Sequence, residues 1–356
     1  MKREEIQEEK KTNHNTQGSS ADQPESTFER IGGCCNVYSK IEKRLKDSMK
    51  GLDLAQAYFH EFGFPMLSRR FPGVVSRIAA GLAGPGSECF GYDDELSRDH
   101  DWGPGFCLWL EDDDFKRYGT VLAEEYAKLP GEFLGFGPRR TSPGEEGRIG
   151  PMKASEFFFL YTGLGHPPDT ISEWLSVPEI NWGLVTNGRV FYDPAGSFTA
   201  RRKAIAAYYP EDIRLKKIAS RCLTIGQAGQ YNMQRSFQRE EPFAFHYAAA
   251  EFSRDVMWMV YLLNRRFVPF YKWLHRGVRD LPVLGREVYD GITKVIRRGA
   301  DIGALDAATE LIGLVTAEMR RQGLSGSTSP FILDHAAEVH EKIEDAKLSA
   351  SLTVFQ

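Results

Sequence analysis

The sequence changes character near Pro210, and this change limits most strongly which folds the chain can adopt. From Pro210 to about Leu348 the apolar residues recur at spacings of three and four, which is typical of amphipathic helices. The longest such run covers residues 243–267. Before Pro210, short apolar runs alternate with turn signals instead. We therefore predict an α/β domain over about residues 46–212, followed by an all-helical bundle domain over residues 213–348.

The first 45 residues are predicted to form an N-terminal extension outside both domains. Residues 1–27 carry almost no apolar side chain beyond Ile6, so they cannot bury enough surface to offset the entropy lost on ordering. We expect this segment to be disordered, and its deletion to shift the thermal midpoint by about one or two degrees at most. The whole chain is 42% hydrophobic and 26% charged, close to the globular average, which excludes a wholly disordered protein.

Charge, hydropathy and cysteine content favour a cytoplasmic protein. The chain has 45 Lys and Arg against 49 Asp and Glu, a formal net charge of −4, which argues against a DNA-binding surface but leaves a local basic channel open. It has no apolar run of about 18 residues and no signal-peptide pattern, so we expect no membrane partner. The chain has five cysteines, and this odd number does not indicate a disulfide framework. No two of them have the CxxC spacing of a zinc site.

Periodicity and turn residues predict the elements of the α/β domain. We expect helices over about 45–63 (closed by Gly63 and Pro65), 74–80 and 115–129, a turn over 81–87, a strand over 99–110, a loop over 130–151 and a hairpin over 181–192. The acidic run 111–114 is interpreted as a helix N-terminus, where negative charge is favourable.

The main candidate site combines Gly86-Ser87 with Asp99-His100-Asp101. On an extended strand, residues two apart face the same side, so the two aspartates are expected to project together. Adjacent carboxylates repel unless a cation lies between them, and Mg²⁺ is the natural candidate because it takes oxygen ligands, with Mn²⁺ as an alternative. The Gly-Ser turn offers backbone N–H groups and a hydroxyl to phosphate. The competing interpretation is an acidic surface strand that follows a glycine-rich turn.

This pattern resembles the nucleotidyltransferase superfamily, in which Gly-Ser is followed after about a dozen residues by Asp-x-Asp on a strand. The stretches 51–110 and 262–282 also look like a bacterial branch of that superfamily. The resemblance implies a polymerase-beta-like nucleotidyltransferase domain with a mixed sheet, followed by a helical domain. It also implies that Asp99 and Asp101 are catalytic metal ligands.

Two further segments are similar to kanamycin nucleotidyltransferase-like enzymes: Glu179-Ile-Asn-Trp-Gly-Leu184 and Tyr192-Asp193-Pro-Ala-Gly196. In those relatives the glutamate is the general base, so the resemblance implies this role for Glu179. The alternative is a glutamate that caps a hairpin or is merely exposed. Glu156 and Asp193 are the candidates for a third metal carboxylate, although Asp193 precedes a proline and is favoured as a turn residue.

Lys272 is the candidate cation of the helical domain. It follows Pro269, which is expected to bend a helix. We expect Lys272 to extend from this bend over the cleft of the α/β domain and to offset the negative charge of a nucleoside triphosphate. The alternative is a solvated lysine whose stem packs beside Trp273. Arg265 and Arg266 have a weaker claim to the same role.

These expectations combine into one enzymatic hypothesis. The chain transfers a nucleoside monophosphate, preferentially AMP from ATP, to a hydroxyl of an unidentified acceptor and releases pyrophosphate. One or two Mg²⁺ ions are held by Asp99 and Asp101, and the outer phosphates are held by Gly86 and Ser87. A small-molecule acceptor is favoured over protein or RNA. The alternatives are a nucleotide-binding regulator of the same fold and a transferase that modifies protein or RNA.

Overall fold

The computed structural model describes residues 48–140 and 148–350. All elements given below belong to the unit that begins at Met49. The predicted extension over residues 1–45 lies outside the described residues, as do Cys34 and Cys35. The cysteines in the described part, Cys89, Cys107 and Cys222, are free and buried.

A mixed four-stranded sheet forms the centre of the first half of this unit, as predicted. Its strands are β1 (Ala79–Leu82), β2 (Cys107–Leu110), β3 (Gly150–Lys153) and β4 (Arg189–Tyr192), in the spatial order β3-β2-β1-β4. β1 is antiparallel to both β2 and β4, with Ala80 opposite Leu108 and Tyr192. β2 is parallel to β3. The connection from β1 to β2, residues 83–106, therefore begins and ends at the same end of the sheet, because these two strands are antiparallel neighbours.

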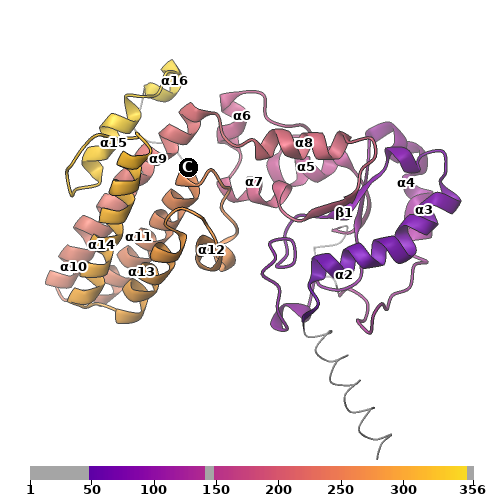
Figure 1. Ribbon diagram of the computed structural model, residues 1–356, viewed down its shortest axis with the longest axis horizontal. Helices are drawn as coiled ribbons and strands as arrows, with labels where there is room; N and C mark the ends of the chain where they lie inside the picture. Colours follow the sequence, from indigo (N-terminus) through magenta and orange to yellow (C-terminus); the bar gives the residue numbers. More distant parts are fainter. Residues whose placement is uncertain (1–47, 141–147, 351–356) are drawn as a thin grey trace, which may run out of the picture. The chain divides into compact units, whose positions relative to one another are not determined.

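Helices cover both faces of this sheet (Figure 1). Leu108 and Leu110 of β2 pack with Phe59 and Leu122 in one buried cluster. Trp109, between them in sequence, belongs to the other cluster and stacks on Phe198 with ring centroids 3.9 Å apart. The first face is covered by α2 (Gly51–Tyr58), the π-helical segment η1 (Phe59–Gly63), α3 (Phe64–Arg70) and α4 (Asp112–Tyr126). The second is covered by α5 (Ala154–Thr162), α7 (Glu179–Thr186) and α8 (Ser197–Ala206), beside α6 (Ile171–Ser176).

Several local predictions in this half are wrong. The helix predicted over 74–80 is a single 3₁₀ turn, η2 (Val75–Arg77), followed by β1, because a short apolar run fits a buried strand as well as a helix. The hairpin predicted over 181–192 is instead the end of α7 joined to β4. The first helix does not end at Gly63 and Pro65 but continues through η1 into α3, where Pro65 lies in the first turn. The acidic N-terminus predicted at 111–114 is confirmed at the start of α4.

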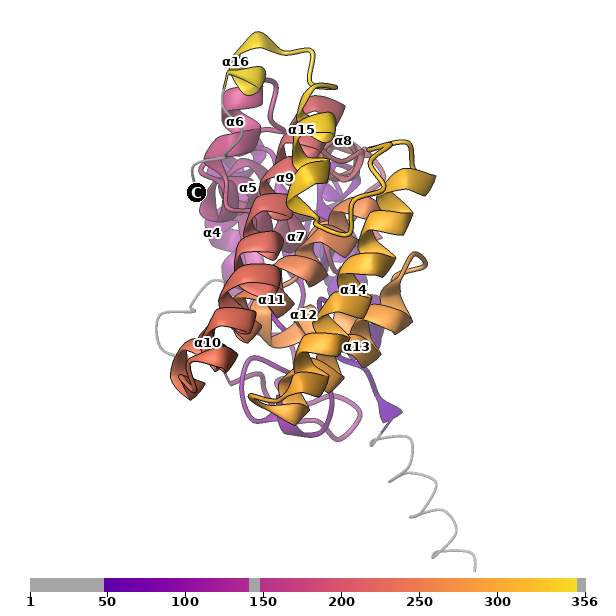
Figure 2. The same cartoon turned by 90° about the vertical axis from the view of Figure 1, so that its left-hand side faces the viewer.

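The second half is helical, as predicted. It comprises α9 (Glu211–Ile225), η4 (a π-helical segment, Gly226–Met233), α10 (Gln234–Gln238), α11 (Pro242–Leu263), α12 (Tyr271–Val278), α13 (Gly285–Arg298), α14 (Ile302–Arg321), α15 (Leu333–His340) and α16 (Ala346–Ser349). Figures 1 and 2 both show α9, α11, α13 and α14 side by side. α11 ends at Leu263, so Pro269 lies in the connection to α12 and does not bend a helix.

One buried apolar cluster connects the two halves. It includes Trp109 from the sheet, Tyr208 from the connection before α9, and Phe245 and Leu311 from the helical half. Apolar contacts therefore run continuously from the sheet into the helical half.

Candidate functional site

A cavity of about 640 Å³ collects most of the residues singled out in the sequence. Gly86, Ser87, Asp99 and Asp101 come from the connection between β1 and β2, and Lys272 comes from the first turn of α12. The loop before β2 also contains the 3₁₀ turn η3 (Leu96–Arg98). Segments as far apart as residues 86 and 272 thus line one space.

The Gly86-Ser87 loop has a backbone that only glycine adopts easily. Gly86 has φ 141°, and a Cβ at this position would lie 2.8 Å from Oε2 of Glu88. Glu88 is buried and forms an ion pair with the equally buried Arg139. The loop is also anchored by Asn187, which donates to the carbonyl oxygen of Gly84 at 2.8 Å and accepts from its N–H at 2.9 Å. The loop is therefore held rigidly where it borders the cavity.

The two aspartates do not lie on a strand, so this part of the prediction is wrong. β2 begins only at Cys107, because Gly103 and Gly105 have φ of 136° and 159° and interrupt the extended chain. Asp99 is 68% exposed, and its Oδ1 is 2.7 Å from Nδ1 of His100. Asp101 is 15% exposed, and its Oδ2 is 3.2 Å from Nη1 of Arg148. Both aspartates nevertheless border the same cavity.

Asp101 has an uncommon backbone conformation. Its φ is 51°, in the left-handed region that aspartate tolerates better than most residues. The N–H of Asp101 donates to the carbonyl oxygen of Arg140 at 2.7 Å, and the guanidinium of Arg139 donates to the carbonyl oxygen of Asp101. Sparsely populated backbone conformations cluster at functional sites, where the surroundings hold them in place.

The acidic residues between the two motifs support the loop. Asp93 is 2% exposed, and its Oδ2 accepts from the N–H of Gly51 at 2.8 Å and from Nε1 of Trp102 at 3.0 Å. Asp93 therefore joins the start of α2 to the loop before β2. Asp94 borders the cavity, and although burial opposes the shift, hydrogen bonds from Ser97 lower its pKa.

Contacts between α12 and the loop after β1 position Lys272. Arg276 donates from Nη1 to the carbonyl oxygen of Tyr92 at 2.8 Å, and the rings of Trp273 and Tyr92 have centroids 5.7 Å apart. A Cβ on Gly277 would lie 2.6 Å from Oη of Tyr92, so glycine allows the close approach. Lys272 itself is exposed at the cavity border.

Glu179 is not among the residues that line this cavity. It is the first residue of α7, and its Oε1 lies 3.1 Å from Nζ of Lys217 and 3.1 Å from Nη2 of Arg221, both on α9. Ile180 and Leu184, on another side of the same helix, do line the cavity. The general-base role of Glu179 stays a prediction.

Neither candidate for a third carboxylate lies on the cavity lining. Glu156 is exposed on α5. Asp193 accepts from the N–H of Gly196 at 3.0 Å and from the N–H of Thr199 at 2.8 Å, the turn role favoured by the sequence. Within residues 48–140 and 148–350, no group of three or more His, Cys, Asp or Glu is placed to hold a metal ion.

The oxygen donors present fit a cation that arrives with a ligand. Mg²⁺ is commonly held by one or two carboxylates while phosphate oxygens and water complete its shell. Asp99, Asp101 and the hydroxyl of Ser87 border one space and supply oxygen atoms only. These three residues, among those in the lining, could hold a cation together with oxygen atoms of a bound ligand.

Sequence reasoning missed the arginines of the site. Arg139 and Arg148 form ion pairs with Glu88 and Asp101 across sequence separations of 51 and 47 residues. Both lie in the Gly- and Pro-rich region 130–151, which gives no periodic signal. No local pattern could have found them.

A family model described as a domain of unknown function, DUF4037, matches residues 174–274. The matched part runs from α6 to α12 and includes Glu179 and Lys272, but not Gly86 to Asp101. No curated protein matches the chain. Among the described helices, none combines the length and apolar character needed to cross a lipid bilayer.

Proposed function

We propose that the chain binds a nucleoside triphosphate in the 640 Å³ cavity and transfers its nucleoside monophosphate to a hydroxyl group, with AMP transfer from ATP as the preferred case. The supporting observation is that Gly86, Ser87, Asp99, Asp101 and Lys272 all border this one space. Such a transfer requires hydrogen-bond donors to the phosphates, carboxylates that hold metal ions, and a positively charged side chain near the phosphates.

The reaction exchanges one bond to the α-phosphorus for another. The oxygen of the acceptor hydroxyl bonds to the α-phosphorus, the bond from that phosphorus to the α,β-bridging oxygen breaks, and pyrophosphate leaves. The hydroxyl proton passes to a base, for which Glu179 remains the prediction. Gly86 and Ser87 bind the outer phosphates through N–H groups and a hydroxyl, and Lys272 offsets their negative charge.

Asp99 and Asp101 would hold the one or two Mg²⁺ ions, or Mn²⁺, that accompany the nucleotide. Such ions, when bound, neutralise phosphate charge. Asp101 is engaged by Arg148 in the described structure, so we propose that Arg148 turns from the carboxylate to the phosphates when nucleotide enters. A guanidinium matches phosphate as well as carboxylate geometry, which makes this exchange chemically easy.

A catalytically weak nucleotide-binding regulator is the second candidate function. Two observations favour it: Asp101 is paired with an arginine, and neither Glu156 nor Asp193 lines the cavity. In this case the cavity binds nucleotide, and the pyrophosphate-releasing step is slow.

Nucleotide labelled at the α-phosphate separates these candidates. Purified protein, Mg²⁺, labelled ATP and a fractionated cell extract should yield label on a small molecule for the preferred proposal, or on protein or RNA for the other acceptors. Asp99→Asn and Asp101→Asn should each abolish transfer. Asp99→Asn should change stability little because the side chain is exposed, whereas Asp101→Asn also removes the ion pair with Arg148. Asp306→Asn, an exposed carboxylate on α14, is the control and should transfer normally. Full transfer by both variants contradicts the proposal, and nucleotide binding without transfer supports the regulator.

A further inference from the structure

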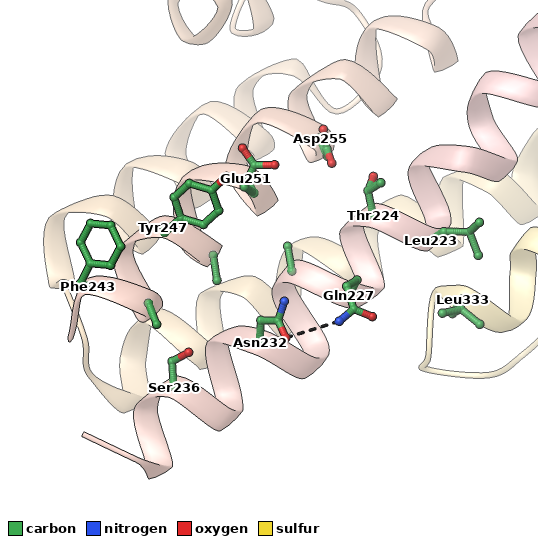
Figure 3. Close-up of a pocket in the computed structure, with 13 residues that line it drawn as sticks. Leu223, Thr224, Gln227, Asn232, Ser236, Phe243, Tyr247, Glu251, Asp255 and Leu333 are labelled. Atoms are coloured by element: carbon green, nitrogen blue, oxygen red, sulfur yellow. Dashed lines mark hydrogen bonds between the residues drawn. The ribbon is translucent and has the colours of Figure 1, made fainter. Parts of the chain in front are cut away.

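A second cavity, of about 780 Å³, lies in the helical half and borders none of the residues assigned above. Phe243, Tyr247, Glu251 and Asp255 line it from α11 (Figure 3). They follow one another at intervals of four, so they share one face of that helix. Thr224, in the last turn of α9, also lines the cavity and lies on a helix next to α11 (Figure 3).

Most of the cavity wall is apolar, and small residues leave the space open. The apolar lining residues, apart from the two aromatic ones, are Leu223, Ala228, Ala244, Ala248 and Leu333. The segment η4 forms part of the wall and is π-helical, a geometry that is frequent at functional sites. It packs tightly on α11, since a Cβ on Gly229 would lie 2.4 Å from Cδ2 of Phe252.

A buried carboxylate oxygen without a partner lies in this wall. Asp255 is 1% exposed, and its Oδ1 is 2.9 Å from Nε of Arg254 and 3.4 Å from Nη1 of Arg221. Its Oδ2 is buried and accepts no hydrogen bond among the described residues. An unsatisfied buried carboxylate oxygen is costly, so a ligand that donates a hydrogen bond to it gains affinity.

The charges around the cavity favour a cationic donor. The lining contains two carboxylates, Glu251 and Asp255, and no Lys, Arg or His, all lining residues being in the described part. The two arginines behind the wall are shared with other acids: Arg221 pairs with Glu179, as Lys217 does, and Arg254 also pairs with Glu251.

Two exposed aromatic rings line the cavity. Phe243 is 81% exposed and Tyr247 is 64% exposed. Their ring centroids are 6.5 Å apart, and the ring planes differ by 24°. Exposed rings of this kind attract both a cation and an apolar ligand body.

We propose that this cavity binds an organic cation, a protonated amine carried on an apolar or aromatic body. The ammonium group donates to Oδ2 of Asp255, the body packs against the apolar wall, and Phe243 and Tyr247 close over it. This site is separate from the nucleotide cavity and does not depend on the function proposed for it.

A matched pair of small probes tests the charge requirement. Calorimetric titration of the full chain with 2-phenylethylamine and with 2-phenylethanol compares an ammonium and a hydroxyl on the same body. The amine should bind, and the alcohol should bind about 10-fold more weakly or not at all, because charge-assisted hydrogen bonds are the stronger ones. Equal binding of the two, or tighter binding of the alcohol, overturns the cationic assignment.

Variants locate the binding. Asp255→Asn should abolish the preference for the amine, and Tyr247→Ala, which changes an exposed side chain, should weaken amine binding about 3-fold. Tyr247→Ala keeps the test valid if Asp255→Asn disturbs the fold. Phe159→Ala, which changes another exposed aromatic residue on α5, and Asp306→Asn, which changes an exposed carboxylate on α14, should bind the amine normally. Loss of binding in these two controls, or unchanged binding in Tyr247→Ala, overturns the site.

Discussion

Glu179 lies between two buried cations. Lys217 is 7% exposed and Arg221 is 4% exposed, and each has a nitrogen 3.1 Å from Oε1 of Glu179. Cations removed from water to this extent need an acceptor close by. Glu179 is therefore a residue on which the packing of α7 against α9 depends, whatever its part in chemistry.

We expect Glu179→Gln to lower the free energy of unfolding by about 3 kcal/mol, because it removes the carboxylate that pairs with the buried Lys217 and leaves the buried Arg221 paired with Asp255 alone. The nucleotide affinity that we propose should stay nearly unchanged, since Glu179 does not line the 640 Å³ cavity. If Glu179 is the base, single-turnover transfer should slow by about 10²–10⁴-fold. Urea unfolding and single-turnover transfer measure the two effects.

The control for this variant is Glu310→Gln, which changes an exposed glutamate on α14 and should alter neither quantity. A normal transfer rate in Glu179→Gln would remove Glu179 from the mechanism. Loss of nucleotide binding together with the rate would make Glu179 part of the nucleotide site.

At the scale of elements, α12 is the helix of the second half that contributes Lys272 and Trp273 to the 640 Å³ cavity. Its contact with Tyr92 depends on Gly277, where a Cβ would lie 2.4 Å from Oη of Tyr261 and 2.6 Å from Oη of Tyr92. Tyr92 also packs on Trp273, and Tyr261 is buried, so neither ring can move far from an added methyl group.

Gly277→Ala should push α12 away from Tyr92 and move Lys272 from its place at the cavity. Equilibrium titration should then show weaker nucleotide binding, and the loss of affinity should not exceed the loss in Lys272→Ala. The double variant should be no weaker than Lys272→Ala alone, because both changes remove the same contact. Additive losses would show that α12 does not act through Lys272.

The ion pair between Arg77 and Asp114 joins η2, just before β1, to the first turn of α4. Nε and Nη2 of Arg77 each donate at 2.8 Å to an oxygen of Asp114. These hydrogen bonds lower the pKa of Asp114 despite the opposing effect of burial. The folded state therefore holds the charged carboxylate to a lower pH than the unfolded chain does.

The stability from this pair should be present above the unfolded pKa of Asp114 and lost as the pH falls through its folded pKa. Asp114→Asn should reduce stability slightly at pH 7, and the variant and the parent protein should converge in strong acid. Urea unfolding across the acid range measures this. A difference that persists unchanged after the carboxylate is protonated would show that the charge is not responsible.

At the scale of the whole molecule, the continuous apolar cluster makes separate unfolding of the two halves unfavourable. Parting them would expose residues such as Trp174, Tyr209 and Phe267, whose rings pack together across the change from α/β to helical structure. Apolar surface returned to water costs about 25 cal/mol per Å².

We therefore expect one calorimetric transition for the unit that begins at Met49, with equal calorimetric and van't Hoff enthalpies. A fragment that begins at residue 213 should be poorly folded, because it loses the sheet side of this cluster. Two resolved transitions, or a cooperatively folded fragment, would contradict this expectation and support two independent domains.

The sequence alone determined those features that depend on neighbouring residues. The helical half was predictable because its apolar spacing persists over many turns, and the start of α4 because three aspartates occupy its first turn. The turn role of Asp193 follows from the proline after it and from its own short carboxylate. The mixed sheet was implied by the family resemblance, and the structure confirms it.

Only the tertiary structure decided which distant groups meet. β1 and α7 are short apolar segments that fit either secondary structure, and their neighbours select one. Asp101 lies before β2 and not on it, because the glycines on either side of Pro104 interrupt the extended chain. The partners of Glu179 and Asp101 lie more than 30 residues away in the sequence, and Arg221 on α9 meets Asp255 on α11 only in the folded chain. Contacts of this kind arise from the packing of whole elements, which no local pattern encodes.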